Sequence, residues 1–282
     1  MNINDINRKL SKKFDGRVTA ELKDGCIVLS GELEDWNDIV DAGMTAATPH
    51  SSSHVVNDIV LKNAVPEKMH IPSVQDDALD GEKCDVLIIG GGISGCSIAR
   101  ELARYKLSIL VLEKEADLAL GASGRNDGEV HPGVDLSKGT LKHKYIRRAN
   151  HMYGDVCREL DVPFMRTGQY ACFTHKSWLP FVWLYAQWRR NVDGIEDTRI
   201  VLGDEIRKQE PEISKDVAFA ISNPSSGSVS PYNLVIGYAE NAVDNGAKIS
   251  LNTAVTGMKV ENGEIKAVYT NRGTVYPKQV IN

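Results

Sequence analysis

The residues best suited to chemistry lie between positions 90 and 113. Glycines stand at 90, 92 and 95, the spacing GxGxxG, directly after the apolar run Cys84–Ile89. In this pattern Gly90 allows a tight turn, Gly92 lets a pyrophosphate approach the backbone, and Gly95 lets a helix pack closely on a strand. Glu113 follows at the distance where a carboxylate accepts hydrogen bonds from a ribose. The pattern predicts a dinucleotide site, because a glycine-rich turn of another kind would leave Glu113 unexplained.

A strand, a helix and a second strand must hold these residues in place. The run 84–89 is apolar enough for a buried parallel strand, and residues 108–112 predict its neighbour. A helix that begins at Ile93 and Ser94 directs its free N–H groups and the positive end of its dipole at the phosphates. We therefore expect Ile93, Ser94 and, beside the acid, Lys114 to contact the cofactor as well.

The next segment distinguishes FAD from NAD. Residues 121–133 read GASGRNDGEVHPG. This resembles the G-x-S-x-R-N-S-G-x-I-H-x-G stretch of the D-amino-acid-oxidase-like FAD-dependent oxidoreductases, which runs along the FAD pyrophosphate toward the flavin. The resemblance implies that FAD is the cofactor and that Ser123, Arg125 and Asn126 help to bind it. Asp127 stands where the family more often has serine, a departure that affects that one contact.

A second stretch of the chain resembles the same family. Residues 227–234, GSVSPYNL, and 239–247, AENAVDNGA, are similar to its G-x-V-x-P-Y-x-L and A-E-N-A-x-x-N-G-A segments. They imply a substrate-domain strand, a helix that returns to the FAD domain, and contact between adenine and the backbone at Val255. The resemblance covers residues 83–282. Since family members continue where this chain stops, it also implies an N-terminal part of a longer enzyme.

Within that family, the chain looks most similar to the anaerobic-type glycerol-3-phosphate dehydrogenases. The resemblance implies oxidation of a small anionic 2-hydroxy substrate, first of all glycerol 3-phosphate to dihydroxyacetone phosphate. One alternative is an L-2-hydroxy acid or amino acid oxidase or dehydrogenase of the same family. Another is a non-catalytic binding fragment with an incomplete flavin fold. The expected partners are the substrate and an electron acceptor or partner subunit.

Oxidation of an alcohol sends a hydride to the flavin and a proton to a base. His131 is the candidate catalytic residue, because it is the only histidine inside a matched motif. Two roles stay open for it, base or brace of its loop, and geometry must decide between them. A basic stretch follows, which either meets an anionic substrate or forms the solvated face of a helix: Lys138, Lys142, His143, Arg147 and Arg148.

Residues 1–64 predict a separate small α+β module. Apolar and polar residues alternate over 17–31 around Asp24-Gly25, which is a hairpin signal. A helix is expected over 34–47 and a strand over 54–61. The matching residues at 24–31 and V-N-D-I at 56–59 resemble the BON domain, which implies docking to a membrane surface or a partner protein. The alternative is a generic appendage.

The predicted fold class is therefore α/β: an FAD-binding Rossmann-like domain with part of an α+β substrate domain, preceded by the small module. Residues 65–83 contain two prolines and an acidic stretch, and they predict a linker. The oxidoreductase domain is expected over 84–282, incomplete, with the substrate-domain insertion at about 160–232.

The composition of the 282 residues excludes several other classes. Lys and Arg number 33 against 38 Asp and Glu, a net charge of −5, which argues against a nucleic-acid partner. No apolar run approaches ~20 residues, and the first residues lack a signal-peptide pattern. We expect a cytoplasmic protein, with docking to a membrane surface or to a partner protein as the two alternatives for its N-terminal module. The five cysteines are scattered without a CxxC, so neither a disulfide framework nor a metal site is expected.

Overall fold

The computed structural model describes residues 3–47, 54–65, 68–195 and 197–282. The chain divides into two compact units, residues 1–69 and 70–282. Among the described residues, no helix is long and apolar enough to cross a membrane.

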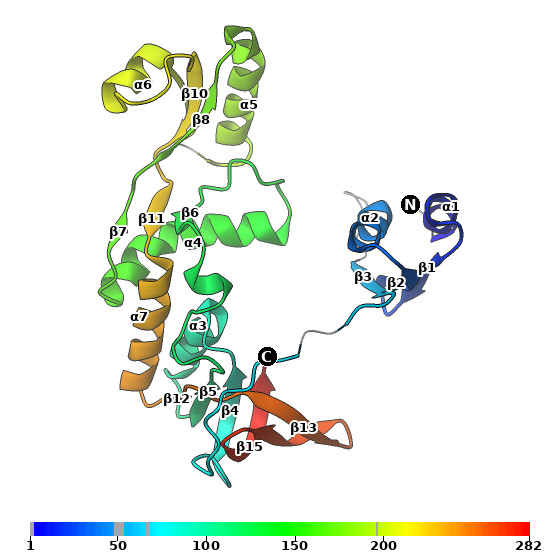
Figure 1. Ribbon diagram of the computed structural model, residues 1–282. Helices are drawn as coiled ribbons and strands as arrows, with labels where there is room; N and C mark the ends of the chain where they lie inside the picture. The colour runs from blue at the N-terminus through cyan, green and yellow to red at the C-terminus, as the bar shows by residue number, and fades with distance from the viewer. Residues whose placement is uncertain (1–2, 48–53, 66–67, 196) are drawn as a thin grey trace. The chain divides into compact units, whose positions relative to one another are not determined.

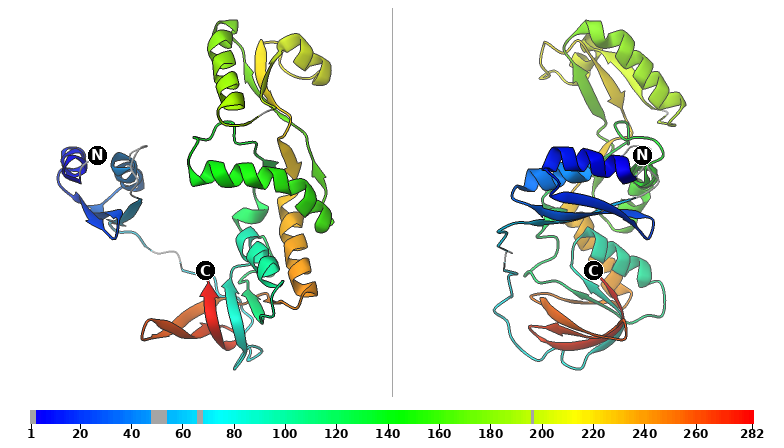
Figure 2. Two further views of the ribbon diagram at one scale, coloured as in Figure 1. Left: turned by 180° about the vertical axis from the view of Figure 1, so that it is seen from behind. Right: turned by 90° about the vertical axis from the view of Figure 1, so that its right-hand side faces the viewer.

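The described part of the first unit runs through two helices and three strands: α1 (Ile3–Phe14), β1 (Val18–Lys23), β2 (Cys26–Leu33), α2 (Trp36–Ala46) and β3 (Val55–Leu61). The sheet order is β1-β2-β3, with β1 and β2 antiparallel and β2 and β3 parallel. Both helices cover one face of this sheet (Figure 2, right). The hairpin turns at Asp24 and Gly25, whose φ values of +50° and +78° are the left-handed backbone that Asp-Gly favours. The predicted hairpin, helix and final strand are confirmed within one or two residues.

Helix α1 is an element that the sequence analysis did not predict. Ile6, Leu10 and Phe14 recur every four residues and are at most 2 % exposed, so they form the face that packs on the sheet. Asp5 in the first turn and lysines in the last turn complement the helix dipole. The spacing of these three apolar residues indicates the helix, since it is close to the period of an amphipathic helix.

The second unit is built on a six-stranded sheet and two covering helices: β4 (Lys83–Ile89), α3 (Ile93–Leu102), β5 (Ile109–Leu112), α7 (Pro231–Asp244), β12 (Lys248–Ser250), β13 (Val255–Glu261), β14 (Glu264–Thr270) and β15 (Gly273–Ile281). The strand order is β12-β5-β4-β15-β14-β13, parallel from β12 to β15 and antiparallel beyond. Helices α3 and α7 lie side by side on one face (Figure 1). On the other face Leu87, Leu110 and Leu112 pack against Val268 and Val275.

The chain between β5 and α7 forms two small sheets and their helices: η1 (Ala122–Gly124), β6 (Glu129–Val130), α4 (Leu141–Glu159), β7 (Phe164–Met165), β8 (Gln169–Phe173), η2 (Lys176–Trp178), α5 (Leu179–Asn191), β9 (Arg199–Leu202), α6 (Gly203–Gln209), β10 (Phe219–Asn223) and β11 (Gly227–Val229). The sheet orders are β8-β10-β9 and β6-β11-β7. Strands β7 and β8 are consecutive but belong to different sheets, because the chain turns at Gly168, whose φ is +68°.

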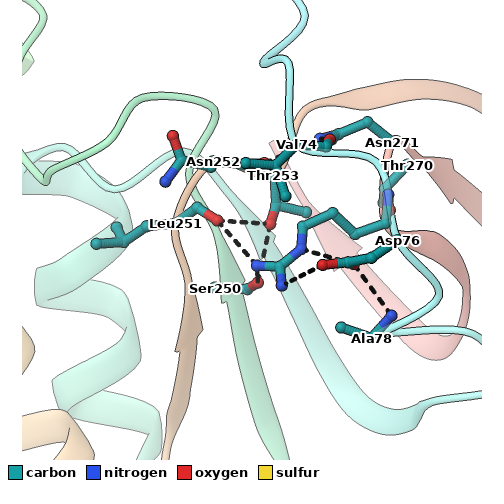
Figure 3. A network of polar contacts seen from close by, with 10 residues as sticks. Val74, Asp76, Ala78, Ser250, Leu251, Asn252, Thr253, Thr270 and Asn271 are labelled. Atoms are coloured by element: carbon teal, nitrogen blue, oxygen red, sulfur yellow. Dashed lines mark hydrogen bonds and ion pairs between the residues drawn. The ribbon is translucent and has the colours of Figure 1, made fainter.

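The predicted linker is shorter than 65–83, because its second half is bonded to the second unit (Figure 3). The Arg272 guanidinium donates to both carboxylate oxygens of Asp76, at 3.0 and 2.9 Å. The same guanidinium reaches the carbonyl oxygen of Leu251 at 3.3 Å, and Asn271 donates to the carbonyl of Val74 at 2.7 Å. Asn271 and Arg272 come almost 200 residues after Val74 and Asp76, so this part of the predicted linker is bonded to a distant part of the chain.

Candidate functional site

The glycine-rich turn joins β4 to α3 at the carboxyl end of the strand. Gly90 has φ +104°, a conformation that favours glycine. A Cβ on Gly95 would lie 2.0 Å from the carbonyl oxygen of Gly90, so no larger residue fits there. Gly92 caps α3 in an extended conformation, and a Cβ on it would lie 2.9 Å from Ser123 Oγ. The backbone has the geometry that the spacing predicted, a tight turn followed by a close helix packing.

Glu113 lies directly beside this turn. Its Oε2 accepts from the N–H of Gly91 at 2.6 Å, and its Oε1 accepts from the N–H of Glu115 at 2.9 Å. A carboxylate has about four lone-pair sites, so it can accept ribose hydroxyls as well. The carbonyl of Glu113 accepts from the N–H of Thr253 at 2.8 Å, which brings the chain just before β13, two residues from Val255, beside Glu113.

The segment 121–133 reaches the beginning of α3 through Ser123. Its Oγ accepts from the N–H of Ile93 at 3.0 Å. Asn126 is exposed and holds the loop in shape: its amide donates to the carbonyl of Ser123, and its Oδ1 accepts from the N–H of Gly128, both at 3.0 Å. Three further predicted side chains are exposed around the turn: Ser94, Lys114 and Arg125. Lys114 Nζ lies 3.7 Å from Glu115 Oε1.

Two pockets lie along this segment. The first, about 160 Å³, joins the starts of α3 and α7 and is lined by Ile93, Ser123, Asn126, Gly128, Glu129, Tyr153, Val229, Pro231 and Leu234. The second, about 390 Å³, is lined by Asp127, Glu129, His131, Thr167, Gly168, Gln169, Tyr170, Ser226, Gly227 and Ser228. The structure thus brings the predicted FAD-binding loop to the first pocket, at the starts of α3 and α7, and His131 to the second, beside the inserted strands β8 and β11. No lysine or arginine is among the described residues that line the second pocket.

Both ring nitrogens of His131 have partners. Nδ1 accepts from the N–H of Gly133 at 2.9 Å, and Nε2 lies 3.2 Å from Asp135 Oδ1. The neutral ring therefore carries its proton on Nε2. The bond to Gly133 lets His131 brace its loop. The side chain is also 28 % exposed and lines the second pocket. This geometry is compatible with both roles that the sequence left open for His131, a catalytic base and a brace of its loop.

A buried network that the sequence analysis missed supports the same loop. Asn150, on α4 and 2 % exposed, donates to the carbonyls of His131 at 3.1 Å and Ser225 at 3.0 Å. Its Oδ1 accepts from Arg166 Nη1 at 3.1 Å. The available signal was weak: a polar residue inside an expected helix is usually solvated, and only the fold shows that this one is inside.

The basic stretch after the flavin loop does not converge on either pocket. Lys138 donates to the carbonyl of Val192, and Arg147 donates to the carbonyl of Gly194. His143 is buried, and burial lowers its pKa. Lys142 and Arg148 are exposed. The stretch therefore ties α4 to the turn after α5, and two of its members form the solvated helix face.

Thiol and metal chemistry find little support in the described part of the chain. All five cysteines are free, and burial raises the pKa of Cys84 and of Cys96 to about 11, so both stay protonated near neutral pH. No group of three His, Cys, Asp or Glu side chains among the described residues is arranged to hold a metal ion.

A parallel sheet, a glycine turn into a helix N-terminus and an acid after the next strand define a dinucleotide-binding α/β protein. The family described as FAD dependent oxidoreductase (DAO) matches residues 85–282. The chain belongs to this family, and FAD is its cofactor. The residues present fit FAD, because a Cβ would fill the approach at Gly92 and the first turn of α3 leaves N–H groups without carbonyl partners inside the helix.

Relatives and solved structures agree with this family. A Caloramator mitchellensis protein named glycerol 3-phosphate dehydrogenase is 35% identical over 199 residues, 70% of this chain and 41% of that protein. The mitochondrial L-2-hydroxyglutarate dehydrogenase of Nematostella vectensis is 30% identical over 204 residues, covering 71% and 44%. The FAD-bound structure of Mycoplasma pneumoniae L-α-glycerophosphate oxidase matches with a TM-score of 0.64 at 26% identity, covering 71% and 53%. The chain spans about half the length of these proteins, or less.

Proposed function

We propose that this chain carries the FAD-binding part of an enzyme that oxidises glycerol 3-phosphate to dihydroxyacetone phosphate. The observation that carries the proposal is the 35% identity, over 199 residues, to a protein named for that substrate. The polar pocket at His131, at the end of the predicted flavin loop, supplies a place for a small hydroxylated substrate. An L-2-hydroxy acid is the next choice, since one relative is named for L-2-hydroxyglutarate.

Different residues along the site would bind different parts of FAD. Gly90, Gly92 and Gly95, with the first N–H groups of α3, would hold the pyrophosphate, and Glu113 the ribose. The backbone near Val255 would hold the adenine. Bound FAD supplies the hydride acceptor. Besides these, Ser94, Lys114, Ser123, Arg125 and Asn126 would line the phosphate path.

His131 is the proposed base for the substrate hydroxyl. Its Nε2 proton is directed at Asp135, which stabilises the ring once it becomes charged. The lone pair that accepts the substrate proton is on Nδ1, so the Gly133 N–H must give way as the substrate hydroxyl arrives. Base action therefore requires a small movement of the loop that carries both residues.

One observation favours a second candidate, oxidation of an amine. The pocket at His131 carries the carboxylates of Asp127 and Glu129, which complement an ammonium group better than a phosphate. An amino acid substrate would meet these acids directly. A phosphate would have to be bound by cationic groups outside the described lining of this pocket.

The test follows flavin bleaching under anaerobic conditions with glycerol 3-phosphate, L-2-hydroxyglutarate and glycine. It uses the FAD-loaded chain and any longer protein that contains it. We expect reduction by glycerol 3-phosphate. Bleaching by glycine alone would move the protein to amine oxidation, and tight FAD binding without any bleaching in either protein would favour a non-catalytic role.

We propose that the first unit is a BON-like docking module that brings the enzyme to a partner subunit or electron acceptor in the cytoplasm. Trp36, Val40 and Met44 stand one turn apart on α2 and are 63 %, 46 % and 70 % exposed. Asp38 lies among them and Glu34 precedes them, so the stripe suits a basic protein surface better than anionic lipid.

Flotation with phosphatidylserine vesicles tests which of the two surfaces the module binds. We expect the chain to stay unbound. Flotation that is lost in Trp36→Ser, and kept when an exposed residue elsewhere in the module is changed, would make the module a membrane anchor instead.

A further inference from the structure

Helix α5 belongs to the predicted substrate insertion, yet its inner face holds the loop that follows His131. Arg189 is 2 % exposed, and its Nη2 donates to the carbonyls of Gly133 at 2.5 Å and Leu136 at 2.6 Å. Tyr185 Oη donates to the carbonyl of Val134 at 2.7 Å. One helix, more than 50 residues further along the chain, thus binds three carbonyls within four residues of this loop.

The guanidinium of Arg189 is itself fixed in place. Its Nη1 lies 2.6 Å from Oδ2 of Asp193, whose side chain is fully buried. The rings of Tyr185 and Trp188 lie against it, with centroids 5.8 and 5.4 Å away. Desolvation offsets most of the attraction in so buried a pair, so the pair orients the guanidinium more than it stabilises the fold. A planar fork with two bound carbonyls restrains this loop at Gly133 and Leu136 and leaves room for only a small movement between them.

The held loop in turn fixes the imidazole of His131. The N–H of Gly133 faces Nδ1, and the carboxylate of Asp135 faces Nε2. Gly133 is bound by Arg189 through its carbonyl, and Asp135 lies between Val134 and Leu136, which α5 also holds. If the loop were released, Gly133 and Asp135 would leave the ring, and the proton could occupy either nitrogen.

We propose that Arg189, together with Tyr185, is a positioning residue that selects the Nε2–H tautomer and the orientation of His131 at the pocket wall. The substrate insertion thereby sets the geometry of the flavin loop. The inference deepens the proposed function, since it gains catalytic meaning from His131 acting as the base. The tautomer itself is a property of the chain that needs no turnover to be measured.

The experiment records the ring ¹⁵N chemical shifts of His131 in the FAD-loaded chain, assigned by the signals missing in His131→Asn. Arg189→Met is combined with Asp193→Leu, which removes the pair without leaving a buried charge alone. Tyr185→Phe removes one hydrogen bond and leaves the pair intact. Arg190→Met is the matched control, an exposed arginine on the same helix.

We expect a single Nε2–H tautomer in the wild type and in Arg190→Met. The Arg189→Met/Asp193→Leu variant should show averaged, converging nitrogen shifts, and Tyr185→Phe a smaller shift in the same direction. A ring that keeps the wild-type shifts in both variants would overturn the proposal. Should the double variant fail to fold, Tyr185→Phe alone decides.

The substrate assay separates this inference from the function it rests on. Converging shifts in Arg189→Met/Asp193→Leu, combined with unchanged flavin bleaching in His131→Asn, would keep the positioning role and remove the base. Unchanged shifts in Arg189→Met/Asp193→Leu, combined with lost flavin bleaching in His131→Asn, would keep His131 as the base and remove the positioning role of Arg189.

Discussion

The nucleotide end and the flavin end of the site are held by different kinds of contact. At the nucleotide end, the N–H of Gly91 meets Glu113 and the N–H of Ile93 meets Ser123, at most 30 residues apart. At the flavin end, the loop of His131 depends on the side chains of Asn150 and Arg189, the latter 56 residues beyond Gly133. Backbone geometry builds the first end, and buried polar side chains build the second.

The difference predicts separate failures. A change in the glycine turn should remove FAD binding and leave the pocket at His131 intact. A change in the buried network should alter the environment of the flavin and leave FAD affinity nearly unchanged. Four substitutions test this separation and a fifth tests the pairing of the linker, from the largest effect to the smallest.

Gly95→Ala should have the largest effect, because its Cβ would lie 2.0 Å from the backbone oxygen of Gly90. We expect the second unit to lose about 3 kcal/mol of stability, the upper part of the range for overpacking. Urea unfolding followed by circular dichroism measures the loss. Gly121→Ala, with nothing within 4 Å of the new Cβ, is the control that should stay near wild type.

Gly92→Val should keep the fold and lose the cofactor. Its nearest neighbour is the movable Oγ of Ser123, at 2.9 Å from a Cβ, so the protein can adapt while the pyrophosphate cannot approach. Loss of two charge-assisted hydrogen bonds predicts FAD affinity about 100-fold weaker. Flavin fluorescence titration measures it. A variant that purifies with the flavin content of the wild type would contradict the site assignment.

Asn150→Ala tests the flavin end. It leaves the carbonyls of His131 and Ser225 without this donor and removes one of the acceptors of Arg166, so we expect the loss of about 2 kcal/mol of stability. The visible absorption of bound FAD should change while its affinity stays within a few-fold. An affinity loss as large as that of Gly92→Val would mean that the two ends are not independent.

Glu113→Ala should weaken FAD binding by about 1.5 kcal/mol, roughly tenfold, because a charged acceptor for the ribose is lost. The effect is smaller than at Gly92, since the phosphates keep their donors. Glu113→Gln is the matched variant: it keeps one acceptor oxygen, and its affinity should fall between the two. Isothermal titration with FAD ranks the three proteins, and an unchanged affinity in Glu113→Ala would exclude the ribose contact.

Asp76→Asn should have the smallest effect, since the pair with Arg272 is exposed and screened by salt. The Arg272 guanidinium lowers the pKa of Asp76 below its ordinary 3.8. The carboxylate therefore contributes stability above that pH, and the contribution is lost as the pH falls through the lowered pKa. The melting temperatures of wild type and variant should differ slightly near pH 7 and converge in acid. A difference that grows in acid would contradict the pairing.

Sequence reasoning reached the nucleotide end because its contacts leave a local record. Gly90, Gly92, Gly95 and Glu113 are fixed by two neighbouring strands, the turn after the first strand and the helix between them, so their spacing encodes the geometry. The same holds for the hairpin at Asp24-Gly25. Helix α1, which was not predicted, has an equally local signal in the spacing of Ile6, Leu10 and Phe14. The sequence therefore contains enough information to predict this helix.

The tertiary structure alone decided the flavin end and the extent of the linker. Asn150, Arg189 and Asp76 have ordinary polar sequence surroundings, and their partners lie between 19 and 196 residues away along the chain. A hydrogen bond between side chain and distant backbone imposes no period and no spacing on the sequence. The sequence by itself determined that this chain binds a dinucleotide through its glycine turn, because backbone geometry constrains residue type locally. The setting of His131 depended on the packing of α4 and α5, because burial is what converts a polar side chain into a fixed hydrogen-bond partner.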